Sequence, residues 1–430
     1  MRVVIIGQQL NRNHADRLKG GIQTCERLHV KLLNELGHEI HFIAAADTEP
    51  FTPHAKLHLL ELPSEETLGE LSRADKAKVS RQKTVEIRDT ISEIRPDFII
   101  NHSYSSSHVR LLADHVEQGI PGIFFNHQNP VVASDISLIA KLEQYIRMTK
   151  LGGALVCVSP FSRDLWRRAI RKRLKSASFA FVEEEMIDQV YNMVCPPAYI
   201  DQVKVWRSDP SNIFVIISRP TREKNVAGFL EVYERSRLKN PVVIFLAVGG
   251  DLESNEYWLA ELKPIIERLK EQGVPIKVRS NAPRADVLSA LETAAFNVIP
   301  WVDESASIVA LEGAQYGTIP LMMSKTREDG SLTGHAAQSL IQLNSPYLEM
   351  LPAGRKHQER AAARLRDTVQ SYEMSSPDEQ YKIRNYLRDR TLRKHSLTCR
   401  VNDLADIMAE VRFRVSSHAT IPAIVRLLEM

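Results

Sequence analysis

The sequence predicts an α/β protein with two doubly wound, Rossmann-like domains, and three observations support this fold class. Its 430 residues are too many for one ordinary core and enough for two. Short apolar runs alternate with amphipathic stretches, as they do in repeated βαβ units. The alternation is interrupted by the proline-marked stretch VCPPAYIDQVKV at residues 194–205, so we expect two separate sheets on either side of it.

The first half opens with the strand RVVIIG, followed by a polar loop and a helix at residues 22–38 whose leucines recur at helical spacing. The strand EIHFIAA comes next. We then expect a helix at 75–94, a strand at 97–102, a helix at 107–118, a strand at 122–127, a helix at 135–149 and a strand at 153–159. The predicted first domain covers residues 1–205.

The second half repeats this pattern. We expect strands at 213–218, 242–249, 275–280, 296–300 and 319–323, separated by helices at 225–238, 255–272, 284–293 and 306–317. The second domain is expected to cover residues 206–395, and the helical residues 396–430 to form a C-terminal tail. Because both sheets are open, we expect ligands beyond the carboxyl ends of their strands, in a crevice that the two domains face.

Composition excludes several classes of protein. Apolar residues make up 43% and charged residues 25% of the chain, as in a soluble globular enzyme. No apolar run suits a signal peptide or a membrane span, so we expect a cytoplasmic protein without integral membrane association. The four cysteines are scattered, which indicates reduced thiols and predicts no metal site. A net charge of +3 does not by itself indicate a polyanionic partner.

Gly20 and Gly21 form the first candidate site, at the junction between the first loop and the first helix. Two glycines there let the backbone approach a ligand, and the helix N-terminus offers N–H groups to an anion. A tight turn is the simpler explanation of the pair. No G-x-G-x-x-G motif is present.

Arg219 and Lys224 follow the apolar run IFVIIS and precede a predicted helix. At the carboxyl end of the second domain's first strand, two cations could offset the charge of a diphosphate leaving group. The alternative is a solvated turn in which the cations pair with Glu223 or Glu231.

The stretch WVDESASIVALEGAQYGTIP contains Glu304 and Glu312 on either side of a predicted helix start. N–H groups of that first turn could bind a phosphate while Glu312 accepts from ribose hydroxyls. A capped helix with an exposed Glu312 is the alternative. The apolar residues around Glu312 favour a functional role, because a carboxylate is rarely placed among apolar residues without a partner.

His127 ends the strand GIFFNH and could donate a hydrogen bond to a bound sugar, although a structural role is the alternative. His102 is a similar, weaker candidate. The segment RDLWRRAIRKRLK could contact a phosphate backbone, a membrane headgroup or only solvent. Its cations are Arg163, Arg167, Arg168, Arg171, Lys172, Arg173 and Lys175.

These stretches together resemble the retaining, nucleotide-sugar-dependent glycosyltransferases of the GT-B fold, of the family 4 type. The resemblance lies in GGIQTCERLHVKLLNELGHEIHFI, in SRPTREKN and in DESASIVALEGAQYGTIPL. It implies that Arg219 and Lys224 hold the donor diphosphate, that Glu304 approaches the donor sugar and that Glu312 contacts the ribose. It also implies donor contacts or catalytic roles for Gly20, Gly21, His127, Ser280, Asn281, Ser305, Ala306, Ser307 and Ile308.

The same resemblance implies UDP-glucose as donor, no tightly bound cofactor, and front-face substitution with retention of configuration. The segment VYNMVCPPAYIDQVKVWRSD and the stretch LEGAQYGTIP further resemble the DNA alpha-glucosyltransferases of T-even phages. That similarity implies 5-hydroxymethylcytosine in double-stranded DNA as acceptor, the basic segment as a DNA contact, and a location in the host cytoplasm. A lipid-linked or polysaccharide acceptor and a catalytically inactive DNA-binding module remain alternatives. The sequence does not indicate an oligomeric state.

Overall fold

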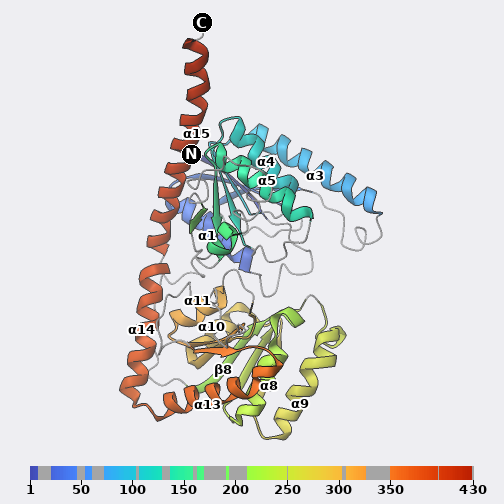
Figure 1. Cartoon of the computed structure of the whole chain (residues 1–430), viewed down its shortest axis with the longest axis vertical. Coiled ribbons are helices and arrows are strands. Elements are labelled where there is room, and N and C mark those ends of the chain that lie inside the picture. The colour runs from blue at the N-terminus through green and yellow to red at the C-terminus, as the bar shows by residue number, and fades with distance from the viewer. Residues whose placement is uncertain are drawn as a thin grey trace. The chain divides into compact units, whose positions relative to one another are not determined.

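The structure is a computed structural model that describes residues 1–7, 21–45, 54–60, 72–102, 106–127, 136–157, 162–168, 190–192, 211–248, 250–302, 307–325, 349–395 and 397–428. These residues form two compact units (Figure 1). Unit 1 contains the described residues up to 192 together with 397–428, and unit 2 contains those from 211 to 395. Each unit is built on one parallel sheet.

The sheet of unit 1 has the order β3-β2-β1-β4-β5-β6-β7, and its neighbouring strands pair in parallel. The central strands are buried along their length because helices cover both faces of the sheet. The strands are β1 (Arg2–Ile6), β2 (Glu39–Ala45), β3 (Ala55–Leu60), β4 (Phe98–Asn101), β5 (Gly122–Asn126), β6 (Ala154–Cys157) and β7 (Val190–Asn192).

The helices of unit 1 form two layers. One layer holds α3 (Arg73–Ile94), α4 (Ser106–Glu117) and α5 (Ile136–Lys150), which lie side by side in Figure 1. In the other layer, α1 (Gly21–Glu35) packs against α15 (Leu397–Leu428). Ser72 caps α3 by accepting a hydrogen bond from the backbone N–H of Asp75 at 3.2 Å.

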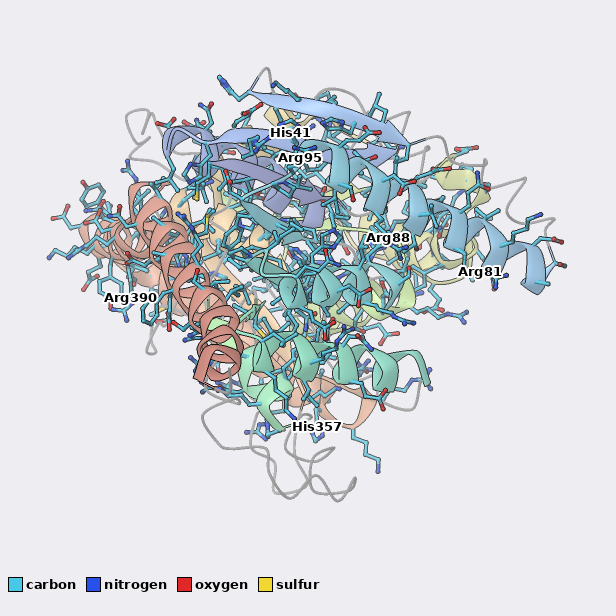
Figure 2. The ribbon with its side chains drawn as sticks, turned by 90° about the horizontal axis from the view of Figure 1, so that it is seen from above. His41, Arg81, Arg88, Arg95, His357 and Arg390 are labelled. Carbon is cyan, nitrogen blue, oxygen red and sulfur yellow. The ribbon has the colours of Figure 1, made fainter. Side chains whose placement is uncertain are left out.

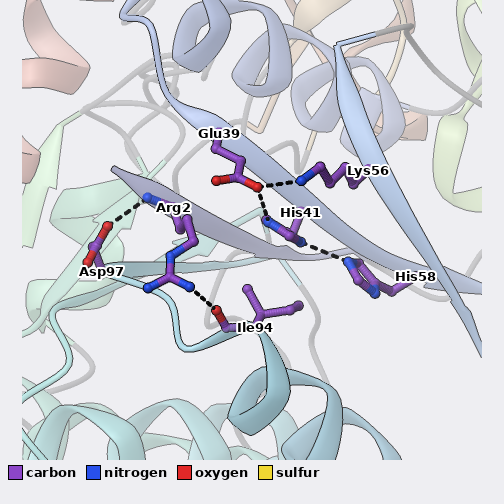
Figure 3. Close-up of polar contacts among 7 residues, drawn as sticks. All are labelled: Arg2, Glu39, His41, Lys56, His58, Ile94 and Asp97. Carbon is purple, nitrogen blue, oxygen red and sulfur yellow. Dashed lines mark hydrogen bonds and ion pairs between the residues drawn. The ribbon is translucent and has the colours of Figure 1, made fainter.

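The amino end of this sheet is closed by polar contacts (Figure 3). The backbone N–H of Arg2 donates to Asp97 Oδ2 at 2.7 Å, which joins the starts of β1 and β4. On β2 and β3, His41 Nδ1 lies 2.9 Å from His58 Nε2, and Glu39 accepts from both His41 and Lys56. Ligands of doubly wound sheets bind at the opposite, carboxyl end, so we assign these contacts a structural role.

The sheet of unit 2 has the order β10-β9-β8-β11-β12-β13, again with parallel neighbours. Its strands are β8 (Ser211–Ser218), β9 (Val242–Leu246), β10 (Ile276–Ser280), β11 (Ala294–Ile299), β12 (Ile319–Ser324) and β13 (Glu349–Pro352). At its centre, the rings of Phe214 and Phe296 stack with centroids 4.8 Å apart. Counted along the chain, both sheets start in the middle, extend to one edge and then return to the other side.

The helices of unit 2 also cover both faces of its sheet. On one face, α8 (Val226–Ser236) packs against α9 (Lys263–Glu271) and α13 (Gln358–Met374). On the other, α11 (Ile308–Gln315) packs against α10 (Arg284–Thr293) and α14 (Pro377–His395). Short helical turns are η3 (Arg222–Lys224), η4 (Leu252–Ser254), η5 (Trp258–Leu262) and η6 (Arg355–His357).

The last helix differs from the expectation of a separate tail at 396–430, because α15 belongs to unit 1. Its apolar residues recur at helical spacing and enter the unit 1 core, and they are Leu404, Ile407, Met408, Val411 and Val415. The helix comes close to Gly152, where φ is +91° and an added Cβ would lie 2.8 Å from the backbone nitrogen of Val415. The two-domain, doubly wound α/β fold predicted from the sequence is confirmed.

Candidate functional site

The strand order of unit 2 reverses between β8 and β11, which makes the carboxyl ends of these two strands the expected ligand position. The segment after β8 runs through Arg219 and η3 into α8. The segment after β11 begins with Pro300 and Trp301. The predicted cations therefore lie on a connection that starts at the switch point of this sheet.

Arg219 is exposed and forms an ion pair with Glu223, with 3.0 Å between Nη2 and Oε1. The two side chains are 60% and 65% exposed, so the pair contributes little to stability. This is the partner that the solvated-turn alternative named. Because water screens the pair, an anionic ligand could take the place of Glu223 without a large cost.

Lys224 ends η3, and its Nζ lies 4.7 Å from the centre of the Trp301 ring. Trp301 is buried, so its ring is a fixed platform for the ammonium group. Next to it, Asn225 adopts a left-handed backbone with φ 52° and donates from Nδ2 to the carbonyl oxygen of Pro300 at 3.0 Å. These two contacts join the connection after β8 to the end of β11 and so fix the position of Lys224.

Trp301 and Asn225 were not singled out from the sequence. The available signal was their position, since each directly follows or adjoins a predicted strand end or helix start. Their pairing depends on the neighbouring positions of β8 and β11, which the sequence does not show.

Glu312 lies on α11, and its side chain is only 3% exposed. It forms an ion pair with Arg284 Nη2 from α10. The expectation that a carboxylate in this apolar stretch has a partner is therefore met by Arg284, a residue that the sequence analysis did not consider. The alternative of an exposed Glu312 is wrong.

The start of α11 is capped from within. Ser307 is buried at the N-cap, and its Oγ accepts from the backbone N–H of Ala310 at 3.3 Å. Ile308 is the first residue of the helix. Glu304, Ser305 and Ala306 lie outside the described residues.

Ser280 ends β10, an edge strand of the sheet, and Asn281 directly follows it. Asn281 has a left-handed backbone with φ 49°, and its Oδ1 accepts from the backbone N–H of Val248 at 2.9 Å. Asn281 thus satisfies the backbone just beyond β9. Ser280 is exposed. The predicted contact with a nucleotide base stays a prediction.

The switch point of unit 1 lies between β1 and β4. His102 directly follows β4 and His127 directly follows β5, and both are buried. His102 Nδ1 lies 2.9 Å from His127 Nε2, and His102 Nε2 lies 2.9 Å from Nδ1 of His29 on α1. The ring of His102 stacks on Phe125 with an interplanar angle of 8°. The structure therefore brings both predicted histidines together and adds a third.

Burial determines the protonation state of this cluster. It lowers the pKa of His127 to about 3, and the nearby His29 acts in the same direction. Burial lowers the pKa of His102 well below its usual value, with smaller contributions from His29 and His127. Both rings are therefore neutral near pH 7. Among the described residues, no group of three or more histidine, cysteine, aspartate or glutamate side chains is arranged to hold a metal ion.

Of the basic segment 163–175, the structure describes the part that ends at Arg168, and 169–175 lie outside the described residues. Arg163 pairs with the neighbouring Asp164, with 3.1 Å between Nε and Oδ1. Arg168 Nε donates to the backbone carbonyl oxygen of Asp164. Arg167 is half-buried. Gly20 also lies outside the described residues, whereas Gly21 begins α1.

No described helix is both long and apolar enough to cross a membrane. The amino-terminal half resembles a known family, because the profile of Glycosyltransferase Family 4 matches residues 19–175. No curated protein gives a significant match to the whole sequence.

Solved structures give the fold. Sucrose-phosphate synthase from Thermosynechococcus elongatus is 12% identical, with a TM-score of 0.65 and coverage of 95% of this chain and 98% of its own. The catalytic domain of starch synthase IV from Arabidopsis thaliana, bound to ADP and acarbose, is 11% identical, with a TM-score of 0.63 and coverage of 96% and 99%.

HepE from Anabaena, in complex with UDP and glucose, is also 11% identical, with a TM-score of 0.63 and coverage of 95% and 99%. The chain has the GT-B fold. At these identities the likeness concerns the fold alone.

Proposed function

We propose that this protein is a nucleotide-sugar-dependent glycosyltransferase whose donor binds at the switch point of unit 2. The observation that carries the proposal is the pair of cations on the connection after β8, one of which is held against Trp301. Support comes from the GT-B fold, from the match to Glycosyltransferase Family 4 and from the UDP and ADP bound in two structures of the same fold.

In this proposal, Arg219 and Lys224 contact the donor diphosphate. Their positive charges offset the charge that develops on the leaving phosphate, and a cation whose position is set before the reaction does so most effectively. Arg219 exchanges its exposed partner Glu223 for phosphate oxygens. The Lys224 ammonium group lies against the Trp301 ring, which limits the positions it can take.

We propose the following roles for the other predicted donor contacts. Glu304 approaches the sugar, Glu312 contacts the ribose, and Ser280 and Asn281 lie near the base. Residues 305–308 offer backbone N–H groups to a phosphate. Unit 1 takes the acceptor, and His127 contacts a sugar hydroxyl. UDP-glucose as the particular donor and retention of configuration are part of the proposal as well.

Alanine substitution tests the diphosphate assignment. Arg219→Ala and Lys224→Ala are each expected to lower kcat/KM at least tenfold, since a factor of ten corresponds to about 1.4 kcal/mol of lost transition-state stabilisation. Arg222→Ala is the matched control, because Arg222 lies on the same turn but pairs with Glu261 at 2.6 Å. Full turnover by both test variants would refute the assignment. The anomeric configuration of the product, read by NMR, tests retention.

The acceptor predicted from the sequence, 5-hydroxymethylcytosine in double-stranded DNA, stays a prediction. It rests on the resemblance of VYNMVCPPAYIDQVKVWRSD and LEGAQYGTIP to the phage enzymes, and it makes the basic segment 163–175 a DNA contact. The described Arg163 and Arg168 already make contacts within that segment. The direct test offers labelled nucleotide sugars together with DNA containing plain or hydroxymethylated cytosine. Label on hydroxymethylated DNA alone supports the prediction. No label on any DNA, with release of free sugar intact, removes DNA as acceptor and leaves the donor site standing.

A second measurement separates DNA from a lipid-linked or polysaccharide acceptor. Retention on duplex DNA and sedimentation with anionic liposomes are compared over a salt titration. Arg167→Ala/Arg168→Ala tests the predicted segment, and Arg81→Ala/Arg88→Ala is a charge-matched control. Figure 2 shows these control arginines along α3, and both are exposed. Equal losses in the two variants would indicate general attraction rather than a specific surface. Binding without transfer from any nucleotide sugar would favour the inactive DNA-binding alternative.

A further inference from the structure

The three buried histidines at the carboxyl end of the unit 1 sheet come from three elements that are distant in the sequence. His29 lies on α1, His102 follows β4 and His127 follows β5. The two nitrogen–nitrogen distances are both 2.9 Å, which is the length of a hydrogen bond. The rings are therefore linked in one line, with His102 in the middle.

The neutral forms of His102 and His127 restrict how protons can be arranged in this line. A neutral imidazole carries one N–H and one acceptor nitrogen. Each of the two contacts needs one proton, because two lone pairs or two N–H groups facing each other repel. If His29 donates from Nδ1 to His102 Nε2, then His102 must donate from Nδ1 to His127 Nε2. The proton of His127 is then on Nδ1.

The reverse arrangement is also consistent. His127 then donates from Nε2 to His102 Nδ1, His102 donates from Nε2 to His29 Nδ1, and the proton of His29 is on Nε2. In the first arrangement all three rings carry the proton on Nδ1, and in the second all three carry it on Nε2. A mixed arrangement breaks one hydrogen bond in a buried place, which costs about 1–3 kcal/mol.

We propose that His29 and His102 are positioning residues that fix, as one coupled unit with His127, which ring nitrogen of His127 carries its proton. The proposal rests on the proposed function, in which His127 contacts a sugar hydroxyl. His127 Nδ1 is the nitrogen of that ring that takes no part in the line. It is a donor in the first arrangement and an acceptor in the second. A change from the first to the second moves one proton along each contact, and it also requires one proton to leave His127 Nδ1 and one to reach His29 Nε2, so the total number of protons stays the same.

Burial supports this assignment on independent grounds. His29 and His102 are fully buried, whereas His127 is 8% exposed. Phe125 stacks on His102 and touches the ring of His29 with centroids 4.2 Å apart. A ring that stacks on Phe125 has its plane fixed, so its two nitrogens stay aligned with both neighbours. The pKa values of His102 and His127 are lowered mainly by burial, which keeps these rings in the neutral form that the proton count requires.

Nitrogen NMR of the full chain, labelled with ¹⁵N-histidine, tests the coupling directly. The ¹⁵N shifts identify the protonated nitrogen of each ring, and single histidine substitutions assign the signals. His115 is an internal reference, because its Nδ1 lies 2.7 Å from the carbonyl oxygen of Leu111 and must carry the proton there. We expect His29, His102 and His127 to show one common tautomer. Different tautomers within the three would overturn the proposal, whether or not sugar transfer is observed.

Two substitutions of His29 test its effect on catalysis. His29→Phe keeps a ring and removes the hydrogen bond to His102. His29→Asn keeps a polar group close to the position of Nδ1. We expect His29→Phe to lower kcat about tenfold with the KM of the nucleotide sugar unchanged, and His29→Asn to recover most of the loss. The ¹⁵N signals of His102 and His127 should report a tautomer mixture in His29→Phe and one tautomer in His29→Asn.

Equal kcat in the two variants would overturn the positioning role, provided both retain the wild-type thermal unfolding midpoint. The NMR comparison decides the matter if His29→Phe unfolds, because it is made on the wild-type chain. If the protein transfers no sugar at all but shows a common tautomer, the proposed function fails while the coupled unit stands.

Discussion

Replacing Glu312 with glutamine separates two roles that the same carboxylate could have. In the structure, Glu312 is paired with Arg284, whereas the resemblance assigns it to the donor ribose. The substitution removes the charge and keeps the shape of the side chain. Net contributions of hydrogen bonds to charged groups are about 1.5–3 kcal/mol. Because Arg284 is 42% exposed and therefore screened, we expect a value at the lower end, about 1.5 kcal/mol.

Hydrogen exchange of peptides that cover α10 and α11 measures the loss of local stability. It does not require a single unfolding free energy for a chain with two units. A loss of about 1.4 kcal/mol corresponds to tenfold faster exchange. Arg284→Met leaves the buried carboxylate without its partner and should have a larger effect, and adding Glu312→Gln to it should recover part of the loss. Asp286→Asn is the control, since its pair with Arg279 is exposed on both sides.

The result that refutes the pairing argument is unchanged exchange in Glu312→Gln and Arg284→Met. Calorimetric titration with UDP tests the proposed contact between Glu312 and the donor ribose. A contact with the ribose predicts at least tenfold weaker binding in Glu312→Gln. Unchanged UDP affinity together with faster exchange would remove Glu312 from the donor site and leave it as a structural residue.

Three further predictions follow from other parts of the molecule. Burial lowers the pKa of His108 to about 4 and that of His127 to about 3. Below pH 6.5 these two histidines take up protons in the unfolded chain but not in the folded protein, so the free energy of unfolding decreases as the pH falls. Each should cost about 1.4 kcal/mol at pH 5.5, seen as a lower urea midpoint than at pH 7.5, and His108→Gln should reduce the difference. Gly152→Ala should destabilise α15 by about 2 kcal/mol, because it combines a left-handed backbone with a close approach, and faster hydrogen exchange of 397–428 would report it. Gly37→Ala is its control, with φ +70° and no atom within 4 Å of the added Cβ, and an equal effect on α15 would contradict the packing argument. Trp301→Leu should weaken UDP binding about threefold, because it removes the cation–π contact with Lys224. Trp301→Phe keeps an aromatic ring and should weaken UDP binding less, and calorimetry measures both affinities.

The elements that the sequence predicted well are the buried ones. Strands such as β1 and β8 contain continuous apolar runs because helices cover both faces of the sheet, and this pattern is visible without a structure. The strands that the sequence analysis missed, β3, β7 and β13, are all at sheet edges. An edge strand is exposed on one side and can be short, so its pattern is weak.

The candidate site was predictable in part for a similar reason. Arg219 and His127 follow strands directly and Lys224 lies on the connection after β8, so topology alone assigns them to the carboxyl end of a sheet. Their partners could not be predicted. Trp301 meets Lys224, Arg284 meets Glu312 and His29 meets His102 only because strands and helices distant in the sequence become neighbours in the fold. The sequence also implied a ligand role for Asn281, whose side chain in the structure satisfies the backbone beyond β9.

The return of α15 to unit 1 affects the order in which the chain can fold during synthesis. Unit 2 is continuous between 211 and 395, so it can complete its core as soon as these residues have left the ribosome. Unit 1 cannot, because the stripe that includes Leu404, Val411 and Val415 is made last and belongs to its core. The amino-terminal unit is therefore finished second. Until α15 arrives, the surface around Gly152 that receives it is open to solvent and to other apolar chains.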